Sequence, residues 1–231
     1  MDLGIFDHLD RRDVPVHEHY ESRLRLLEKY DAAGFYSYHL AEHHATPLGL
    51  APVPGIFLAA ASQRTRRIRL GPCVYCLPLY NPLRLIEEIC MLDHLSRGRF
   101  DFGVGRGIVP YEMAYFDLHH LETEEIYEET LEIVLQGLTS ETLEHRGTRY
   151  RYQKVPMVLR PFQQPHPPLW DGMGLPARAA RPGARAPTSA SGRSATWRSG
   201  RACWWPLLCA WRRLRGRRRG CRRFARRAPT W

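Results

Sequence analysis

The sequence has no hydrophobic run long enough to cross a membrane. Its longest apolar run, from Trp204 to Trp211, is far shorter than the about 20 residues that a membrane-spanning helix needs. Its first residues, Met1 to Gly4, also lack the basic and apolar regions of a secretory signal peptide. Both absences predict a cytoplasmic protein without a membrane partner.

Eight residue types are absent from residues 171–231: Lys, His, Glu, Ile, Val, Asn, Gln and Tyr. This segment holds 16 Arg and one acidic residue, Asp171, whereas residues 1–170 hold 18 Lys and Arg against 23 Asp and Glu. With so few aliphatic side chains, the segment cannot offset the entropy cost of becoming ordered. We therefore predict a globular part, residues 1–170, and a disordered, basic, low-complexity tail, residues 171–231.

The unusual tail has two explanations. Its mixture of Arg, Ala, Pro, Gly, Ser and Trp is typical of GC-rich coding DNA translated out of frame, so one hypothesis is a frameshift near codons 171–176. Ten arginines in the sixteen residues from Arg212 to Arg227 suggest the alternative, a non-catalytic truncated protein whose tail binds nucleic acid without sequence preference. No recognised nucleic-acid-binding fold accompanies these arginines, so nucleic acid is not the expected partner.

The cysteines do not form a recognisable metal site. Cys73 and Cys76 have the C-x-x-C spacing of a zinc or redox pair, but no second pair of cysteines or histidines completes a set of four ligands. Together with Cys90 they lie in apolar stretches, where a free cysteine packs like a small hydrophobic residue. We therefore expect no metal.

Short apolar runs alternate with helical patterns over residues 3–170. We expect strands at 3–6, 35–40, 68–77, 99–104 and 167–170, with a small hairpin at 142–152. We expect helices at 20–34, 54–63, 82–96 and 122–138, the last being the longest. Because parallel strands need crossover connections, this alternation predicts a parallel α/β sheet, either open or closed into a barrel. No Gly-x-Gly-x-x-Gly follows the first strand, which argues against a dinucleotide-binding fold.

Two segments that follow expected strands carry candidate chemistry. Glu42-His43-His44 places a carboxylate beside two imidazoles, which can shuttle protons near neutral pH; a purely structural cluster is the alternative. One histidine is expected to face the site and the other to be structural. Arg106 lies between Gly105 and Gly107, either to bind a phosphate together with the backbone or to lie in a solvated turn. Asp101 is expected to face the helices.

Several of these segments, taken in order, strongly resemble the bacterial luciferase-like flavin monooxygenases. The resemblance runs from Leu3 to Trp170 and ends where the basic tail begins. The segments that carry it are Ala41-Glu42-His43-His44, Arg67-Ile68-Arg69-Leu70-Gly71, Leu77-Pro78-Leu79-Tyr80-Asn81-Pro82-Leu83-Arg84, Leu92-Asp93-His94-Leu95-Ser96-Arg97-Gly98-Arg99 and Phe102-Gly103-Val104-Gly105-Arg106-Gly107.

This resemblance implies an α/β fold of the (β/α)8 TIM-barrel type, of which the chain would hold the first half to five-eighths. It implies a flavin-dependent monooxygenase that uses reduced FMN and dioxygen to oxygenate a small organic substrate. The reduced FMN would come from a flavin reductase as a separate partner, and a homodimer is expected. The related deazaflavin-dependent reductases share the barrel, so deazaflavin is an alternative cofactor. An incomplete barrel would have lost part of this site, so the chain as written could be inactive.

The resemblance also assigns roles to particular residues. His43 matches the catalytic histidine of the family, and Arg106 matches the arginine that holds the FMN phosphate. Cys73 and Val74 match a pair joined by a cis peptide bond against the flavin ring. Three further positions, Glu42, Gly105 and Ile108, fall near the flavin. Gly105 stands where luciferases proper have a reactive cysteine, so light emission is not expected.

Overall fold

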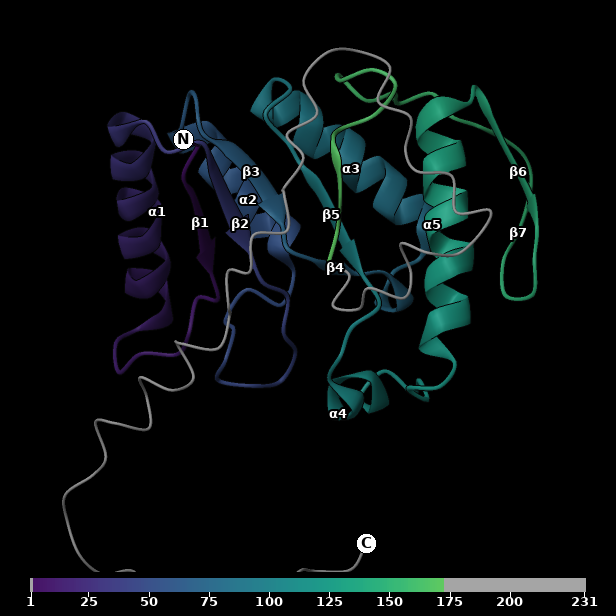
Figure 1. Cartoon of the computed structure of the whole chain (residues 1–231), viewed down its shortest axis with the longest axis horizontal. Helices are drawn as coiled ribbons and strands as arrows, with labels where there is room; N and C mark the ends of the chain where they lie inside the picture. Colours follow the sequence, from purple (N-terminus) through teal and green to yellow (C-terminus); the bar gives the residue numbers. More distant parts are fainter. Residues whose placement is uncertain (1, 173–231) are drawn as a thin grey trace, which may run out of the picture. The chain divides into compact units, whose positions relative to one another are not determined.

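Helices and strands alternate along the part of the chain that the computed structural model describes, residues 2–172 (Figure 1). These residues all belong to the first of two units into which the chain divides, Met1–Ala179. The predicted disordered tail, its frameshift and its nucleic-acid-binding arginines lie outside the described residues, apart from Asp171 and Gly172. The elements are β1 (Gly4–Asp7), α1 (Val16–Ala33), β2 (Ser37–Leu40), α2 (Pro54–Arg64), β3 (Arg69–Pro72), β4 (Tyr75–Cys76), the 3-10 helix η1 (Leu77–Leu79), α3 (Pro82–Ser96), β5 (Phe102–Gly105), α4 (Pro110–Ala114), α5 (Thr123–Thr139), β6 (Thr142–Arg146), β7 (Arg151–Pro156) and β8 (Leu169–Asp171).

The strands that precede and follow the main helices pair in parallel, in the orders β1-β2-β3 and β4-β5-β8. An isolated parallel bridge between Leu70 and Phe100 links the two sets. The antiparallel hairpin β6-β7 is separate from them. The parallel α/β organisation predicted from the sequence is therefore confirmed, whereas closure into a barrel and the fraction of a barrel present stay predictions.

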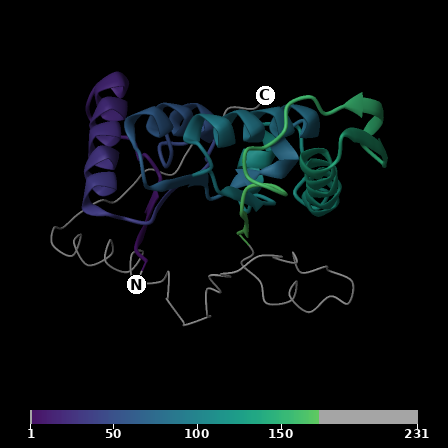
Figure 2. The ribbon, with the colours of Figure 1, turned by 90° about the horizontal axis from the view of Figure 1, so that it is seen from above.

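The helices follow one another beside the strands. Helix α1 packs against α2, α2 against α3, and α3 against α5. Seen from above, purple α1 and teal α5 lie at the two ends of this row, with α2 and α3 between them (Figure 2). Helix α1 is one residue longer than α5, so the prediction that the helix near residues 122–138 is the longest was wrong. No helix among residues 2–172 is both long and apolar enough to cross a membrane.

Helix boundaries follow from local sequence. Helix α1 ends at Gly34, whose φ of 82° is a left-handed conformation that glycine adopts without a steric cost. Helix α3 begins with Pro82 after Asn81, whose side chain accepts a hydrogen bond from the backbone N–H of Arg84 at 3.3 Å. It ends at Arg97, a non-glycine residue in the left-handed region with φ of 56°.

The predicted third strand is interrupted. The chain forms β3 and β4 on either side of a cis peptide bond between Cys73 and Val74. The neighbouring strand β5 has glycines at the positions where this segment lies against it. A Cβ at Gly103 would overlap the carbonyl oxygen of Pro72, and one at Gly105 would lie 2.5 Å from Cγ2 of Val74. The two glycines therefore let the interrupted segment lie against β5.

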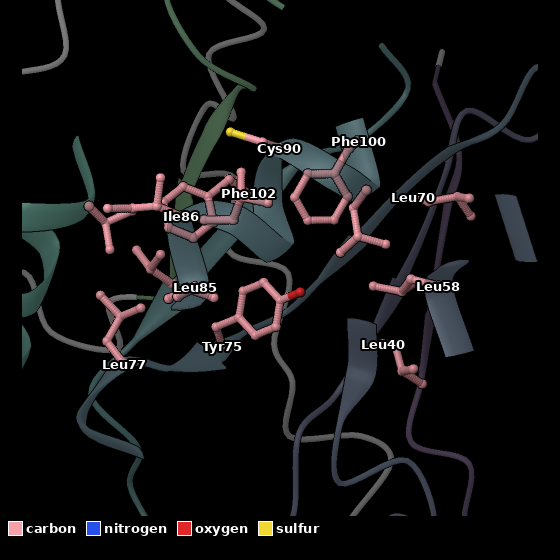
Figure 3. Close-up of a cluster of buried hydrophobic side chains, with 14 of the residues drawn as sticks. Leu40, Leu58, Leu70, Tyr75, Leu77, Leu85, Ile86, Cys90, Phe100 and Phe102 are labelled. Carbon is pink, nitrogen blue, oxygen red and sulfur yellow. The ribbon is translucent and has the colours of Figure 1, made fainter. Parts of the chain in front are cut away.

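The core lies between the strands and the helices (Figure 3). Buried side chains from the strands meet buried leucine and isoleucine side chains from α2 and α3. Those labelled in Figure 3 are Leu40, Leu58, Leu70, Tyr75, Leu77, Leu85, Ile86, Cys90, Phe100 and Phe102. Phe100 and Phe102 belong to this cluster, so the intervening Asp101 points to the opposite side of its strand.

Asp101 therefore does not face the helices, and that prediction was wrong. Its carboxylate accepts a hydrogen bond from Nε of Arg69 at 2.8 Å and lies 3.5 Å from Nε2 of His39. The imidazole ring of His39 in turn lies 5.4 Å from the ring of Trp170. The face of the strands away from the helices thus carries a charged, nearly buried cluster rather than an apolar layer.

Candidate functional site

The predicted site residues all lie at or after the carboxyl ends of parallel strands. Glu42 and His43 follow β2, Cys73 and Val74 follow β3, and Gly105 ends β5. Arg106 and Ile108 come next, before the short helix α4, which lies at this edge in the lower part of Figure 1. Parallel strands bring their carboxyl ends to the same edge of a sheet, which is where α/β proteins hold ligands.

Glu42 is a buried hub on this edge, 4% exposed. Its carboxylate accepts hydrogen bonds from the Tyr80 hydroxyl at 2.7 Å and from the backbone N–H of Cys76 at 3.3 Å. The Nε2 atom of His44 lies 3.0 Å from the other carboxylate oxygen. Burial raises the pKa of Glu42, and its contacts with His44 and Tyr80 oppose that rise. Glu42 therefore ties the loop after β2 to the segment that follows β4.

His43 has a different carboxylate partner. Its Nδ1 lies 3.1 Å from Oε1 of Glu112, which is itself 2% exposed on α4. The other oxygen of Glu112 accepts a hydrogen bond from the backbone N–H of His44 at 3.2 Å. The ring of His43 stacks on that of His8, with centroids 5.5 Å apart, and burial together with the proximity of His43 lowers the pKa of His8.

The two adjacent histidines thus have separate environments. His44 contacts Glu42 and packs edge-on against Phe116, while His43 lies between Glu112 and His8. The side chain of His43 is 16% exposed.

The segment of Cys73 and Val74 forms a close-packed wall. Val74 lies against Gly105 and also against Gly172. Burial raises the pKa of the Cys73 thiol, and burial together with the carboxylates of Glu42 and Glu112 raises that of Cys76 further. Burial therefore favours the protonated thiol form of both cysteines. Over residues 2–172, no three His, Cys, Asp or Glu side chains are grouped so as to hold a metal ion.

Arg106 and Ile108 are the most exposed members of the predicted set. The Arg106 side chain is 42% exposed, and its guanidinium lies 3.5 Å from the carboxylate of Glu124 on α5. Ile108 is 86% exposed. Both residues follow the end of β5, and their roles toward a flavin stay predictions.

Sequence reasoning missed three residues of this edge: His8, Tyr80 and Glu112. His8 follows β1 in the same way that His43 follows β2, so its position after a strand was an available signal. Tyr80 lies within a segment that carried the family resemblance. Glu112 had no such signal, because only the folded structure brings α4 beside the loop after β2.

The chain matches a known protein family over most of its length. The family model described as luciferase-like monooxygenase matches residues 1–189, so the chain belongs to the luciferase-like monooxygenase family. Among curated proteins, it is 47% identical over 177 residues to the uncharacterized protein y4wF of Sinorhizobium fredii, covering 77% of this chain and 52% of that protein. It is 28% identical to the oxygenase component of the flavin-dependent trigonelline monooxygenase of Acinetobacter baylyi, covering 74% and 48%. The chain thus spans about half the length of these relatives.

Solved structures share the fold. The monooxygenase RslO1 from Streptomyces bottropensis matches with a TM-score of 0.71 and 34% identity, over 74% of this chain and 53% of that one. The oxygenating constituent of 3,6-diketocamphane monooxygenase from Pseudomonas putida, solved with FMN, matches with a TM-score of 0.68 and 20% identity over 74% and 51%. The coenzyme F420-dependent tetrahydromethanopterin reductase from Methanopyrus kandleri gives 0.59 and 19% over 74% and 49%.

Proposed function

We propose that the chain is the flavin-binding part of the oxygenase component of a two-component monooxygenase. Such an enzyme would take reduced FMN from a separate flavin reductase and use dioxygen to oxygenate a small organic substrate. The observation that carries the proposal is that His43, the Cys73–Val74 segment and Arg106 each follow the carboxyl end of a parallel strand, in a chain of this family. The relative from Acinetobacter baylyi, an oxygenase component, supports the division of labour with a reductase.

The residues present fit a flavin. Gly103 and Gly105 let Pro72 and Val74 lie directly against β5, so the Cys73–Val74 segment forms a close-packed wall against which a flat ring could lie. The guanidinium of Arg106 is partly exposed and suits a phosphate, which it can bind through two parallel hydrogen bonds. When bound, the reduced flavin would supply two electrons to dioxygen, so that one oxygen atom enters the substrate and the other forms water.

Side chains of this chain would orient the cofactor, move a proton and hold the surrounding loops in place. Arg106 would exchange its contact with Glu124 for the phosphate and so orient the cofactor. The imidazole of His43 would hold or move a proton near the reacting atoms, as imidazoles do near neutral pH. Glu42, through Tyr80 and Cys76, would keep the loops around the cofactor in place. Ile108, exposed next to Arg106, would cover part of the cofactor.

The identity of the cofactor is the first question for experiment. Deazaflavin is the alternative, because a reductase of the same fold depends on F420. Titrating the full-length chain with reduced FMN, reduced riboflavin and reduced F420, under anaerobic conditions, separates these choices. We expect FMN to bind and riboflavin, which lacks the phosphate, to bind more weakly. Binding of F420 alone would favour the deazaflavin reductases, and binding of none of the three would contradict the proposal.

Substituting Arg106 tests whether this side chain binds the phosphate of FMN. Arg106→Ala should weaken FMN binding about 10- to 100-fold, because a hydrogen bond to a charged group contributes about 1.5–3 kcal/mol. It should leave riboflavin binding unchanged, since riboflavin has no phosphate. Arg146→Ala, which removes an exposed arginine on β6, is the matched control and should change neither affinity. Equal losses for FMN and riboflavin would show that Arg106 does not hold the phosphate.

A further inference from the structure

Glu112 is a buried carboxylate whose two oxygens bind adjacent residues of one loop. Oε1 lies 3.1 Å from Nδ1 of His43, and Oε2 accepts the backbone N–H of His44 at 3.2 Å. The residue is 2% exposed and comes from α4, whereas its partners follow β2. A single side chain therefore fixes both the backbone of the loop and the position of one imidazole.

The chemistry of this contact decides where His43 carries its hydrogen. An ionised carboxylate only accepts hydrogen bonds, so with Glu112 ionised the hydrogen between the two groups belongs to Nδ1 of His43. In a neutral imidazole the other nitrogen, Nε2, then has a free lone pair. Within residues 2–172, Nε2 of His43 has no hydrogen-bond partner, and its side chain is partly exposed at the strand edge.

The neighbouring imidazoles show that this arrangement is specific to His43. His8 stacks on His43 but has no carboxylate within hydrogen-bond distance, and its buried Nδ1 is unpartnered among the described residues. Asp7 and Asp10 act on His8 only through longer-range charge. His44 is oriented by Glu42 through the opposite ring nitrogen, Nε2. Of these three rings, only His43 is held by a buried carboxylate at Nδ1.

We infer that Glu112 is a positioning residue that holds His43 with its hydrogen on Nδ1 and leaves Nε2 for the reacting groups. The catalytic meaning of this inference rests on the proposed function, in which His43 acts near the cofactor. The tautomer of His43 itself does not depend on it. Carboxylates that orient a functional histidine through its second nitrogen are a common device in enzyme sites.

The tautomer can be measured directly on the full-length chain labelled with 15N in histidine. Long-range 1H–15N correlation spectra distinguish the protonated from the bare ring nitrogen, and His43→Gln identifies the signals of His43. We expect Nδ1 of His43 to carry the hydrogen in the unmodified protein. Glu112→Ala should abolish that single tautomer and shift both ring nitrogens of His43 toward the values of a mixture. Glu112→Asp, with a shorter reach, should give a partial shift.

The control is Glu125→Ala, which removes an exposed carboxylate from the first turn of α5 and should leave the His43 signals unchanged. A hydrogen on Nε2 of His43 in the unmodified protein would overturn the inference, and this spectrum decides the question even where Glu112→Ala does not fold. Unchanged His43 signals in a folded Glu112→Ala chain would also overturn it. Failure of FMN binding with the expected tautomer present would refute the proposed function alone.

Discussion

Buried carboxylates organise this protein at the scale of single residues, and Asp31 is the clearest structural case. It lies in the last turn of α1, where a negative charge is unfavourable for the helix dipole. Its side chain accepts backbone N–H groups of Arg66, Arg67 and Ile68 at 3.0, 2.8 and 2.6 Å. Asp31 therefore attaches α1 to the turn that leads into β3.

This attachment has a predictable pH dependence. Burial acts to raise the pKa of Asp31, but the three backbone N–H groups outweigh it and lower the pKa. A carboxyl whose pKa is lower in the folded state stabilises the fold above the unfolded pKa of about 3.9, and loses this contribution as the pH falls through the folded value. Asp31→Asn should therefore cost about 1–3 kcal/mol of unfolding free energy at pH 7 and less below about pH 4.

Urea unfolding followed by circular dichroism at pH 7 and at acidic pH measures this difference. Asp13→Asn, which changes an exposed carboxylate in the loop before α1, is the control and should have almost no effect at either pH. A cost for Asp31→Asn that is the same at both pH values would show that the carboxylate charge is not responsible.

At the scale of elements, the contact between α3 and α5 depends on one glycine. Gly137 is buried on α5, and a Cβ at this position would overlap the Cδ1 methyl of Ile86 on α3. Glycine inside a helix costs about 1 kcal/mol relative to alanine, so its presence here is explained by the close approach of the two helices. Ile86 is fully buried and has little room to move away.

Gly137→Ala should therefore destabilise the protein by about 1 kcal/mol, because overpacking costs about 1–3 kcal/mol and the gain in helix propensity offsets part of it. Ile86→Val removes the Cδ1 methyl and should relieve the overlap. The double variant should then be about 1 kcal/mol more stable than the sum of the single effects predicts. Urea unfolding of the four proteins measures this coupling, and additive effects would show that the two side chains do not compete for space.

Most helices and strands of this fold could be predicted from the sequence, but two of their features could not. Apolar periodicity located the four main helices and the parallel strands, because each repeat buries one face against its neighbour. It did not predict that the third strand is interrupted, since Gly103 and Gly105, which accommodate the interruption, lie on another strand. It also misplaced Asp101, because a charged side chain on the inner face of the strands is paired there by Arg69 from the adjacent strand.

For the whole molecule, one part of the candidate site could be predicted from the sequence and another part could not. The loops after β2, β3 and β5 could be found from sequence, since local motifs mark the carboxyl ends of strands. Glu112 could not, because its role depends on two segments, about 70 residues apart, that meet only in the fold. Distances and partners, rather than residue identities, distinguish the roles of His43 and His44.

Residues 171–231 are the part of the chain to which the frameshift hypothesis applies. The chain spans about half the length of the curated relatives it matches, and the absence of eight residue types sets this segment apart from an ordinary globular segment. Resequencing codons 165–185 and translating all three frames to the next stop tests the frameshift hypothesis. We expect one alternative frame to restore the missing Lys, Glu, Ile and Val together with alternating strand and helix patterns. Their absence from both alternative frames would make the basic segment a genuine part of this protein, and flavin binding by the chain as written would then have to rest on residues outside it.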